Sequence, residues 1–116
     1  MPSTRALIVR PRLYIEKSMG IGPGKIDLLR EVDQTHSISA AARALGMSYK
    51  RAWRLIDSLN QGFGRPVVET AIGGKQGGGA TLSKLGQQLV ERYTALENRL
   101  NSAARTELAA LRRLLK

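Results

Sequence analysis

The chain has 116 residues, one histidine and no cysteine, with 19 lysine and arginine residues against 9 acidic residues and a formal net charge of +10. This length supports one domain with one additional element, and the composition excludes a disulfide scaffold and a tetrahedral zinc site. The longest apolar run, Ala6–Val9, is far shorter than the roughly 20 residues of a membrane span, so we expect a cytoplasmic protein without a membrane segment. The positive charge favours a polyanionic partner, with nucleic acid the first choice and an anionic membrane surface the second.

The N-terminal third of the chain is predicted to contain a strand, a loop and a helix. Residues 6–16 alternate between apolar and polar side chains, and Pro11 places this strand at a sheet edge or divides it into two short strands. Three glycines and a proline within residues 18–24 predict a loop. From Lys25 the apolar residues recur at helical spacing, which predicts a helix that ends near His36.

Two capped helices are predicted next. Ser37 is the expected N-cap of a short helix that Gly46 ends, and Ser48 is the expected N-cap of a second helix that stops at the glycines and proline of residues 62–66. We expect Trp53 in the core. The inward faces are predicted to comprise Ile38, Ala41, Ala42 and Leu45 in the first helix and Tyr49, Ala52, Leu55, Ile56 and Leu59 in the second.

A β-hairpin is predicted after these helices. Residues 67–72 are rich in β-branched side chains, and residues 80–82 supply a partner strand across a flexible, glycine-rich loop at 73–79. Lys75 in this loop is not expected to contribute to a core. A wing that follows the minor groove or the backbone of DNA, however, needs such a cation. A solvated loop is the alternative. Arg65, at the base of the hairpin, could contact a phosphate.

The C-terminal segment from Ser83 to Lys116 is predicted to be one long amphipathic helix, or two helices with a break near Asn101 and Ser102. The preceding domain is too small to cover its whole apolar stripe, so we expect the remainder to pack against a second subunit. The predicted dimerisation residues are Leu89, Tyr93, Leu96, Leu100, Leu108, Leu111 and Leu115.

This order of elements is typical of a winged helix-turn-helix, for which a chance pair of packed helices is the alternative. Ala42 is small where the two helices must cross, and Gly46 follows where a left-handed backbone is needed. We therefore predict a mainly α fold with a small β-sheet. Residues 1–82 are expected to form a winged helix-turn-helix DNA-binding domain, and residues 83–116 a long C-terminal helix for dimerisation.

The cations gather where such a fold contacts DNA. Between Arg43 and Lys75, six cationic residues face only Asp57 and Glu69. In a helix-turn-helix the first turn of the second helix enters the major groove. We therefore expect the polyanion to contact this part of the chain.

Individual side chains of the second helix have predicted roles. The helix start near Ser48 favours a phosphate, and Lys50 and Arg54 lie four residues apart on one outward face, where they can reach guanine edges, with Arg51 beside them. The alternative is a solvated basic face without base contacts. Tyr49 is expected either to bond a phosphate or base, or to pack on its own domain.

No enzyme site is predicted. The Gly24-Lys25 pair lacks the leading glycine of a phosphate-binding loop, because position 19 is Met19, and Ile26 replaces its serine or threonine. His36 has no nucleophile or metal-ligand partner nearby in sequence and is expected at a helix end. We expect no metal, no cofactor and no catalytic residue.

Several motifs resemble the N-terminal DNA-binding domain of ModE-type molybdate-responsive transcriptional regulators, itself similar to the winged helix of LysR-type regulators. They are KIDLL at 25–29, SISAAA at 37–42, MSYKRAW at 47–53, Asn60, PVVE at 66–69, GGKQGGGA at 73–80 and LSKLG at 82–86. The resemblance covers about residues 6–96. It implies a homodimeric, sequence-specific regulator of transcription, with these residues at DNA-facing positions: Ser39, Ser48, Tyr49, Lys50, Arg54 and Lys75.

The complete predicted DNA-binding set is Ser39, Arg43, Ser48, Tyr49, Lys50, Arg51, Arg54, Arg65 and Lys75. Full-length regulators of this type carry C-terminal oxyanion-binding domains, for which we find no strand-rich segment after Leu82. We therefore expect no molybdate site in this chain, while control of molybdenum-related genes is what the resemblance implies. The alternatives are a nonspecific nucleoid-type DNA binder and a protein-interaction module that uses the C-terminal helix.

Overall fold

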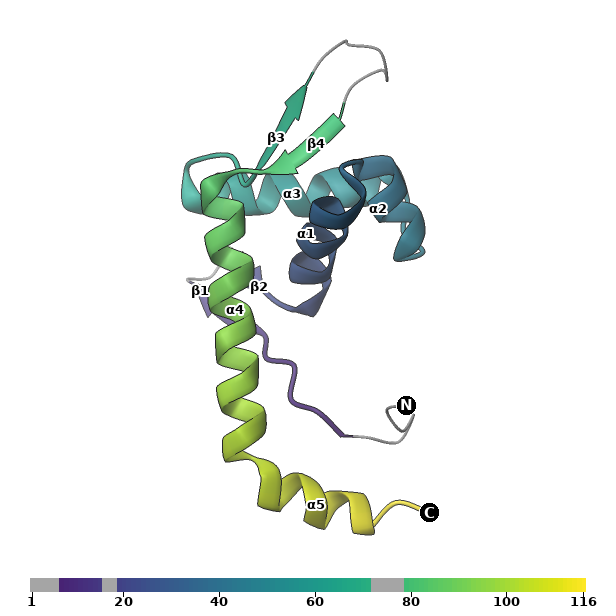
Figure 1. The fold of residues 1–116 in the computed structure, drawn as a ribbon, viewed down its shortest axis with the longest axis vertical. Helices are drawn as coiled ribbons and strands as arrows, with labels where there is room; N and C mark the ends of the chain where they lie inside the picture. Colours follow the sequence, from purple (N-terminus) through teal and green to yellow (C-terminus); the bar gives the residue numbers. More distant parts are fainter. Residues whose placement is uncertain (1–6, 16–18, 72–78) are drawn as a thin grey trace.

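The computed structural model describes residues 7–15, 19–71 and 79–116 (Figure 1). At one end of the molecule, helices α1, α2 and α3 group beneath the β3–β4 hairpin, and α4 leads from the hairpin to α5 at the opposite end, where the N-terminal segment also lies. The predicted mainly α winged helix-turn-helix is confirmed. The elements are β1 (Leu13–Ile15), β2 (Met19–Ile21), α1 (Pro23–Thr35), α2 (Ile38–Ala44), α3 (Tyr49–Phe63), β3 (Val68–Ala71), β4 (Gly79–Leu82), α4 (Lys84–Ala103) and α5 (Arg105–Arg113).

The predicted loop at residues 18–24 is wrong, because part of it is a strand. Strand β2 pairs antiparallel with β1, with Gly20 opposite Tyr14. Its flanking residues Met19 and Ile21 are buried and β2 contacts α3, so this packing outweighs the local preference of glycine for loops. Helix α1 then starts at Pro23, since proline suits the first helical position. Of the predicted strand at 6–16, the structure describes only β1 as a strand.

Helix α1 forms the centre of the core. Its residues Ile26, Leu29 and Val32 are fully buried, and α2 and α3 pack against it. The turn between α2 and α3 has the predicted chemistry, because Gly46 adopts a left-handed backbone with φ of 66°. The core is completed by these further residues: Met19, Ile21, Leu28, Ile38, Ala41, Ala42, Ala52, Ile56, Leu59, Val67, Val68, Ala80, Leu82 and Tyr93.

The β3–β4 hairpin is fixed to the helices through its backbone. The N–H of Ala80 donates to the carbonyl of His36 (2.9 Å), which ends α1 in a left-handed conformation, as the prediction of a helix-end residue required. The N–H of Val67 donates to Oδ1 of Asn60 on α3 (2.8 Å). Ser83 caps α4, and its hydroxyl donates to the carbonyl of Pro66 (2.8 Å). The hairpin therefore has a defined position beside α3.

Charged residues join α4 to α1 and to the N-terminal segment. Arg30 on α1 contacts Asp27 (3.4 Å) and Glu97 (2.9 Å), and Arg10 pairs with the same two carboxylates at 2.6 Å and 3.6 Å. The hydrogen bond to Asp27 is the main cause of the raised pKa of Arg10. Asn101 exchanges two hydrogen bonds with the backbone of Val9, at 2.7 Å and 2.9 Å.

The C-terminal segment consists of two helices, as one of the two predicted alternatives stated. The break is at Ala104, two residues after the predicted position, and α5 turns sharply from the direction of α4 (Figure 1). No proline or glycine marks this break. No helix in the described part of the chain is long and apolar enough to cross a membrane.

Candidate nucleic-acid interface

The first turn of α3 is built by its N-cap. The Ser48 hydroxyl accepts a hydrogen bond from the N–H of Arg51 (3.0 Å), as predicted. Ala52 and Ile56 on the inner face of α3 are buried, so the opposite face points to solvent. Lys50 and Arg54 lie on that outer face and are both exposed, which leaves their charged groups accessible at the start of the helix.

The cations near α3 are free to contact a partner. Lys50, Arg51, Arg54 and Arg65 are exposed, and none has a hydrogen bond or ion pair with any residue that the structure describes. Arg43 on α2 is also exposed and donates to the hydroxyl of Ser39 (3.1 Å), another predicted DNA-facing residue.

Other cations are committed to the fold. Lys25 is the clearest case, since its ammonium donates to the carbonyl of Gly20 (2.6 Å) and to Ser58 on α3 (2.8 Å). Burial, with a smaller contribution from the charge of Arg12, lowers the pKa of Lys25. Lys25 therefore holds α3 against α1 and β2, and its charge is used within the fold.

Tyr49 does not face inward as the helical spacing predicted. Its side chain is 56% exposed, because the first turn of α3 extends beyond the core toward the hairpin. Its ring meets that of Trp53 edge to face, with centroids 6.3 Å apart and planes at 80°. Trp53 is half-buried and packs against the core, so the prediction that it lies in the core is correct only in part.

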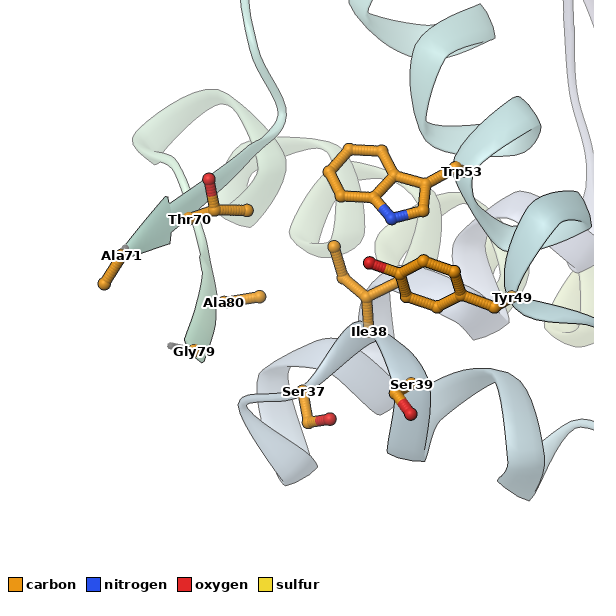
Figure 2. Close-up of a pocket in the computed structure, with 9 residues that line it drawn as sticks. All are labelled: Ser37, Ile38, Ser39, Tyr49, Trp53, Thr70, Ala71, Gly79 and Ala80. Carbon is orange, nitrogen blue, oxygen red and sulfur yellow. The ribbon is translucent and has the colours of Figure 1, made fainter. Parts of the chain in front are cut away.

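A hollow of about 320 Å³ lies between the start of α2, the start of α3 and the β3–β4 hairpin (Figure 2). We call it the wing-side hollow. Tyr49 and Trp53 project into it from α3, while Thr70 and Ala80 face them from the hairpin. The complete lining comprises Ser37, Ile38, Ser39, Tyr49, Trp53, Thr70, Ala71, Gly79 and Ala80.

Of the residues that line this hollow, the sequence predicted Ser39 and Tyr49 at the DNA interface but not Trp53 or Thr70. Trp53 follows Tyr49 by four residues, and Thr70 shares a face of β3 with buried Val68, so helical spacing and strand alternation were the available signals. Lys75 of the hairpin loop lies outside the described residues. The strands beside that loop pair as predicted, with Thr70 opposite Ala80.

The predicted dimerisation residues fall into three groups by exposure. The prediction of Tyr93 as a dimerisation residue is corrected, because only 3% of this residue is exposed and it packs within its own chain. Its hydroxyl donates to the carbonyl of Pro11, and Arg30 lies over its ring at 5.9 Å. Leu111 and Leu115 on α5 are 52% and 49% exposed. The remaining four are half-buried: Leu89, Leu96, Leu100 and Leu108.

Three curated proteins are similar to this chain. The molybdenum-pterin-binding protein MopB of Rhodobacter capsulatus is 46% identical over 77 residues, covering 66% of this chain and 28% of that protein. The DNA-binding transcriptional dual regulator ModE of Escherichia coli strain K12 is 40% identical over 84 residues, covering 72% and 32%. The molybdenum transport protein ModE of Azotobacter vinelandii is 33% identical over 126 residues, covering 99% and 46%. The chain therefore spans less than half the length of these relatives, and the predicted resemblance to the ModE type is confirmed.

Solved structures and a family comparison agree on the fold. The CbnR DNA-binding domain in its complex with DNA aligns with a TM-score of 0.57 at 23% identity, covering 75% of this chain and 95% of that chain. A LysR family transcriptional regulator aligns with a TM-score of 0.55 at 20% identity, covering 72% and 27%. Residues 24–87 match the family described as bacterial regulatory helix-turn-helix protein, lysR family. The chain belongs to the LysR family of bacterial regulatory helix-turn-helix proteins.

Proposed function

We propose that this protein binds double-stranded DNA at specific sequences and regulates transcription, as a binding protein and not as an enzyme. The observation that carries the proposal is the outer face of α3, where Lys50 and Arg54 are exposed beside a capped helix start and have no polar partner among the described residues. An arginine fork can bond O6 and N7 of guanine in the major groove, and lysine can do so less selectively. Family membership and the DNA-binding relative support this use of α3.

The proposed place of action is the cytoplasm, and the proposed targets are molybdenum-related genes. The relatives include one named as a molybdenum transport protein and one named as a molybdenum-pterin-binding protein. Among the residues that the structure describes, no group of three histidine, cysteine or acidic side chains could hold a metal ion. We assign DNA binding to the described residues and propose no molybdate site on them.

We further propose that the protein acts as a homodimer, with residues 1–82 contacting DNA and residues 83–116 joining the subunits. Leu111, Leu114 and Leu115 near the C-terminus expose 52%, 78% and 49% of their side chains, and Leu7 and Ile8 expose theirs nearby. Such a cluster of apolar side chains is costly to leave in water and favours association. Two subunits would present two copies of α3 to a two-fold symmetric site.

A selection of bound fragments from genomic DNA tests the proposed function. The expected result is recovery of a few fragments that share a two-fold symmetric sequence, with those near molybdenum-related genes enriched. Recovery of fragments without a shared sequence would refute specific regulation and favour the nonspecific nucleoid-type binder. If the protein retained no DNA, the result would favour the alternative that it is a protein-interaction module that uses its C-terminal helices.

The proposed dimer has a separate test in sedimentation analysis. The variant Leu111→Glu places a charge in the exposed apolar cluster of α5 and is expected to sediment as a monomer. Glu107→Gln changes a charge on the same helix and is the matched control, expected to remain dimeric. If Leu111→Glu remained dimeric, the proposal that the exposed leucines of α5 form the dimer interface would be refuted.

A further inference from the structure

The wing-side hollow contains hydrogen-bond donors that the fold leaves unused. The indole nitrogen of Trp53, the hydroxyl of Tyr49 and the hydroxyl of Thr70 have no hydrogen-bond partner among the described residues. The hydroxyl of Ser39 accepts a bond from Arg43, so its own proton is available to donate. Figure 2 shows the two rings close together, with the indole nitrogen on the edge that faces Tyr49 and the phenolic oxygen at the end of its ring nearer the hairpin.

The chemistry of these donors defines the ligand. An indole N–H can only donate, and hydroxyl groups can each donate one proton. No acidic residue is among the described residues that line the hollow, so none of them would repel an anion there by its charge. The group that fits is an anion with several acceptor oxygens, and on duplex DNA that group is the backbone phosphate.

The position of the hollow agrees with this ligand. It lies between the first turn of α3, which the proposed function places in the major groove, and the β3–β4 hairpin, which would follow the adjacent groove or backbone. One strand of the duplex must pass between these two elements. The hollow is open to solvent.

We propose that the wing-side hollow binds one backbone phosphate of the duplex through neutral donors, chiefly Tyr49, Trp53 and Thr70. This inference rests on the proposed function. It adds a phosphate contact made by uncharged side chains to the contacts proposed for the exposed cations. Neutral donors release no counterions of their own, whereas lysine and arginine do. The hollow therefore adds affinity for every sequence without adding to the salt dependence of binding.

Two variants at the hollow test the proposal with duplex DNA as the probe. Tyr49→Phe and Thr70→Val remove one hydroxyl each from exposed side chains, so both variants are expected to unfold at the wild-type temperature. Each is expected to lower affinity by about 10-fold for all duplexes and to leave the slope of log K against log salt unchanged. Arg65→Ala, at the base of the hairpin, is expected to reduce that slope by about 1, and Tyr14→Phe, at an exposed position on β1, is the matched control without effect.

A modified duplex identifies the phosphate. Neutral methylphosphonates are introduced one at a time along a duplex that the wild type selects. At one position per half-site the wild type is expected to lose about 10-fold in affinity, while Tyr49→Phe loses much less there because its contact is already absent. Equal losses for the two proteins at every position, or wild-type affinity of Tyr49→Phe, would overturn the proposal.

The design separates this inference from the proposed function. If no preferred sequence is selected, specific regulation fails, but Tyr49→Phe can still be measured on an arbitrary duplex, since the proposed contact is to the backbone. A 10-fold loss with an unchanged salt slope would then support the hollow alone. A selected sequence that Tyr49→Phe binds as tightly as the wild type would preserve the function and refute the hollow.

Discussion

Gly86 lies where the start of α4 crosses the chain that enters the hairpin, and its replacement by alanine should strongly destabilise the protein. A Cβ at this position would approach the carbonyl oxygen of Val67 to less than 3.0 Å, and would lie 3.2 Å from the carbonyl carbon of Val67 and 3.3 Å from Cβ of Leu82. The first two obstacles are backbone atoms, which cannot rotate away as a flexible side chain can. Either α4 or the hairpin must therefore move.

The expected loss follows from these contacts. Forcing a methyl group into a packed site costs about 1 to 3 kcal/mol, and the shift also strains the hydrogen bond from Ser83 N–H to the Val67 carbonyl (2.9 Å), worth about 1 kcal/mol. The helix preference for alanine over glycine offsets up to about 1 kcal/mol. The net loss in free energy of unfolding is thus about 1 to 4 kcal/mol, or a fall in Tm of roughly 4 to 20 °C for a chain of this size.

Thermal unfolding followed by circular dichroism measures this effect, with Gly24→Ala as the matched control. Gly24 also lies in the first turn of a helix, but a Cβ there would meet nothing within 4 Å. Gly24→Ala is therefore expected to raise stability by about 0.5 to 1 kcal/mol. A Gly86→Ala protein as stable as the wild type, or stabilised like Gly24→Ala, would refute the close approach of α4 to Val67.

Two further changes probe the segments that hold the interface in place. Asn101→Ala removes both hydrogen bonds to Val9 and is expected to cost about 1 to 2 kcal/mol and to speed hydrogen exchange at the Val9 amide; protection equal to that of the wild type would contradict the pairing. Ser48→Ala removes the cap of α3 and is expected to cost about 1 kcal/mol, whereas Ser102→Ala at an exposed position on α4 is the control with no effect; equal stability of the two variants would argue against the cap.

Local chemistry explains which parts of the fold could be predicted from the sequence. The N-caps Ser37 and Ser48 and the left-handed Gly46 depend on residues within a few positions of each other, so their types and spacing suffice to identify them. One of the two alternatives for the C-terminal segment places a break within three residues of Ala104, where the structure has it, although Ala104 is not a helix-breaking residue.

Nonlocal contacts explain what the sequence could not show. Strand β2 buries Met19 and Ile21 and contacts α3, although the glycines of its own segment argue against a strand. Tyr49 has the spacing of an inward residue, but no part of the core extends beneath the first turn of α3. The wing-side hollow is formed by α2, α3 and the hairpin, so its donors come together only in the folded chain.

The most direct test of the central claim, that the outer face of α3 distinguishes DNA sequences, is the specificity ratio of Arg54→Ala. This ratio is the affinity for a selected duplex divided by the affinity for a shuffled duplex of the same composition, measured at one salt concentration. A bidentate contact from Arg54 predicts that the ratio falls by about 10-fold or more, with Arg113→Ala on exposed α5 retaining the wild-type ratio. An unchanged ratio for Arg54→Ala, with affinity for both duplexes lowered equally, would show that this arginine contacts phosphate alone and would contradict the claim.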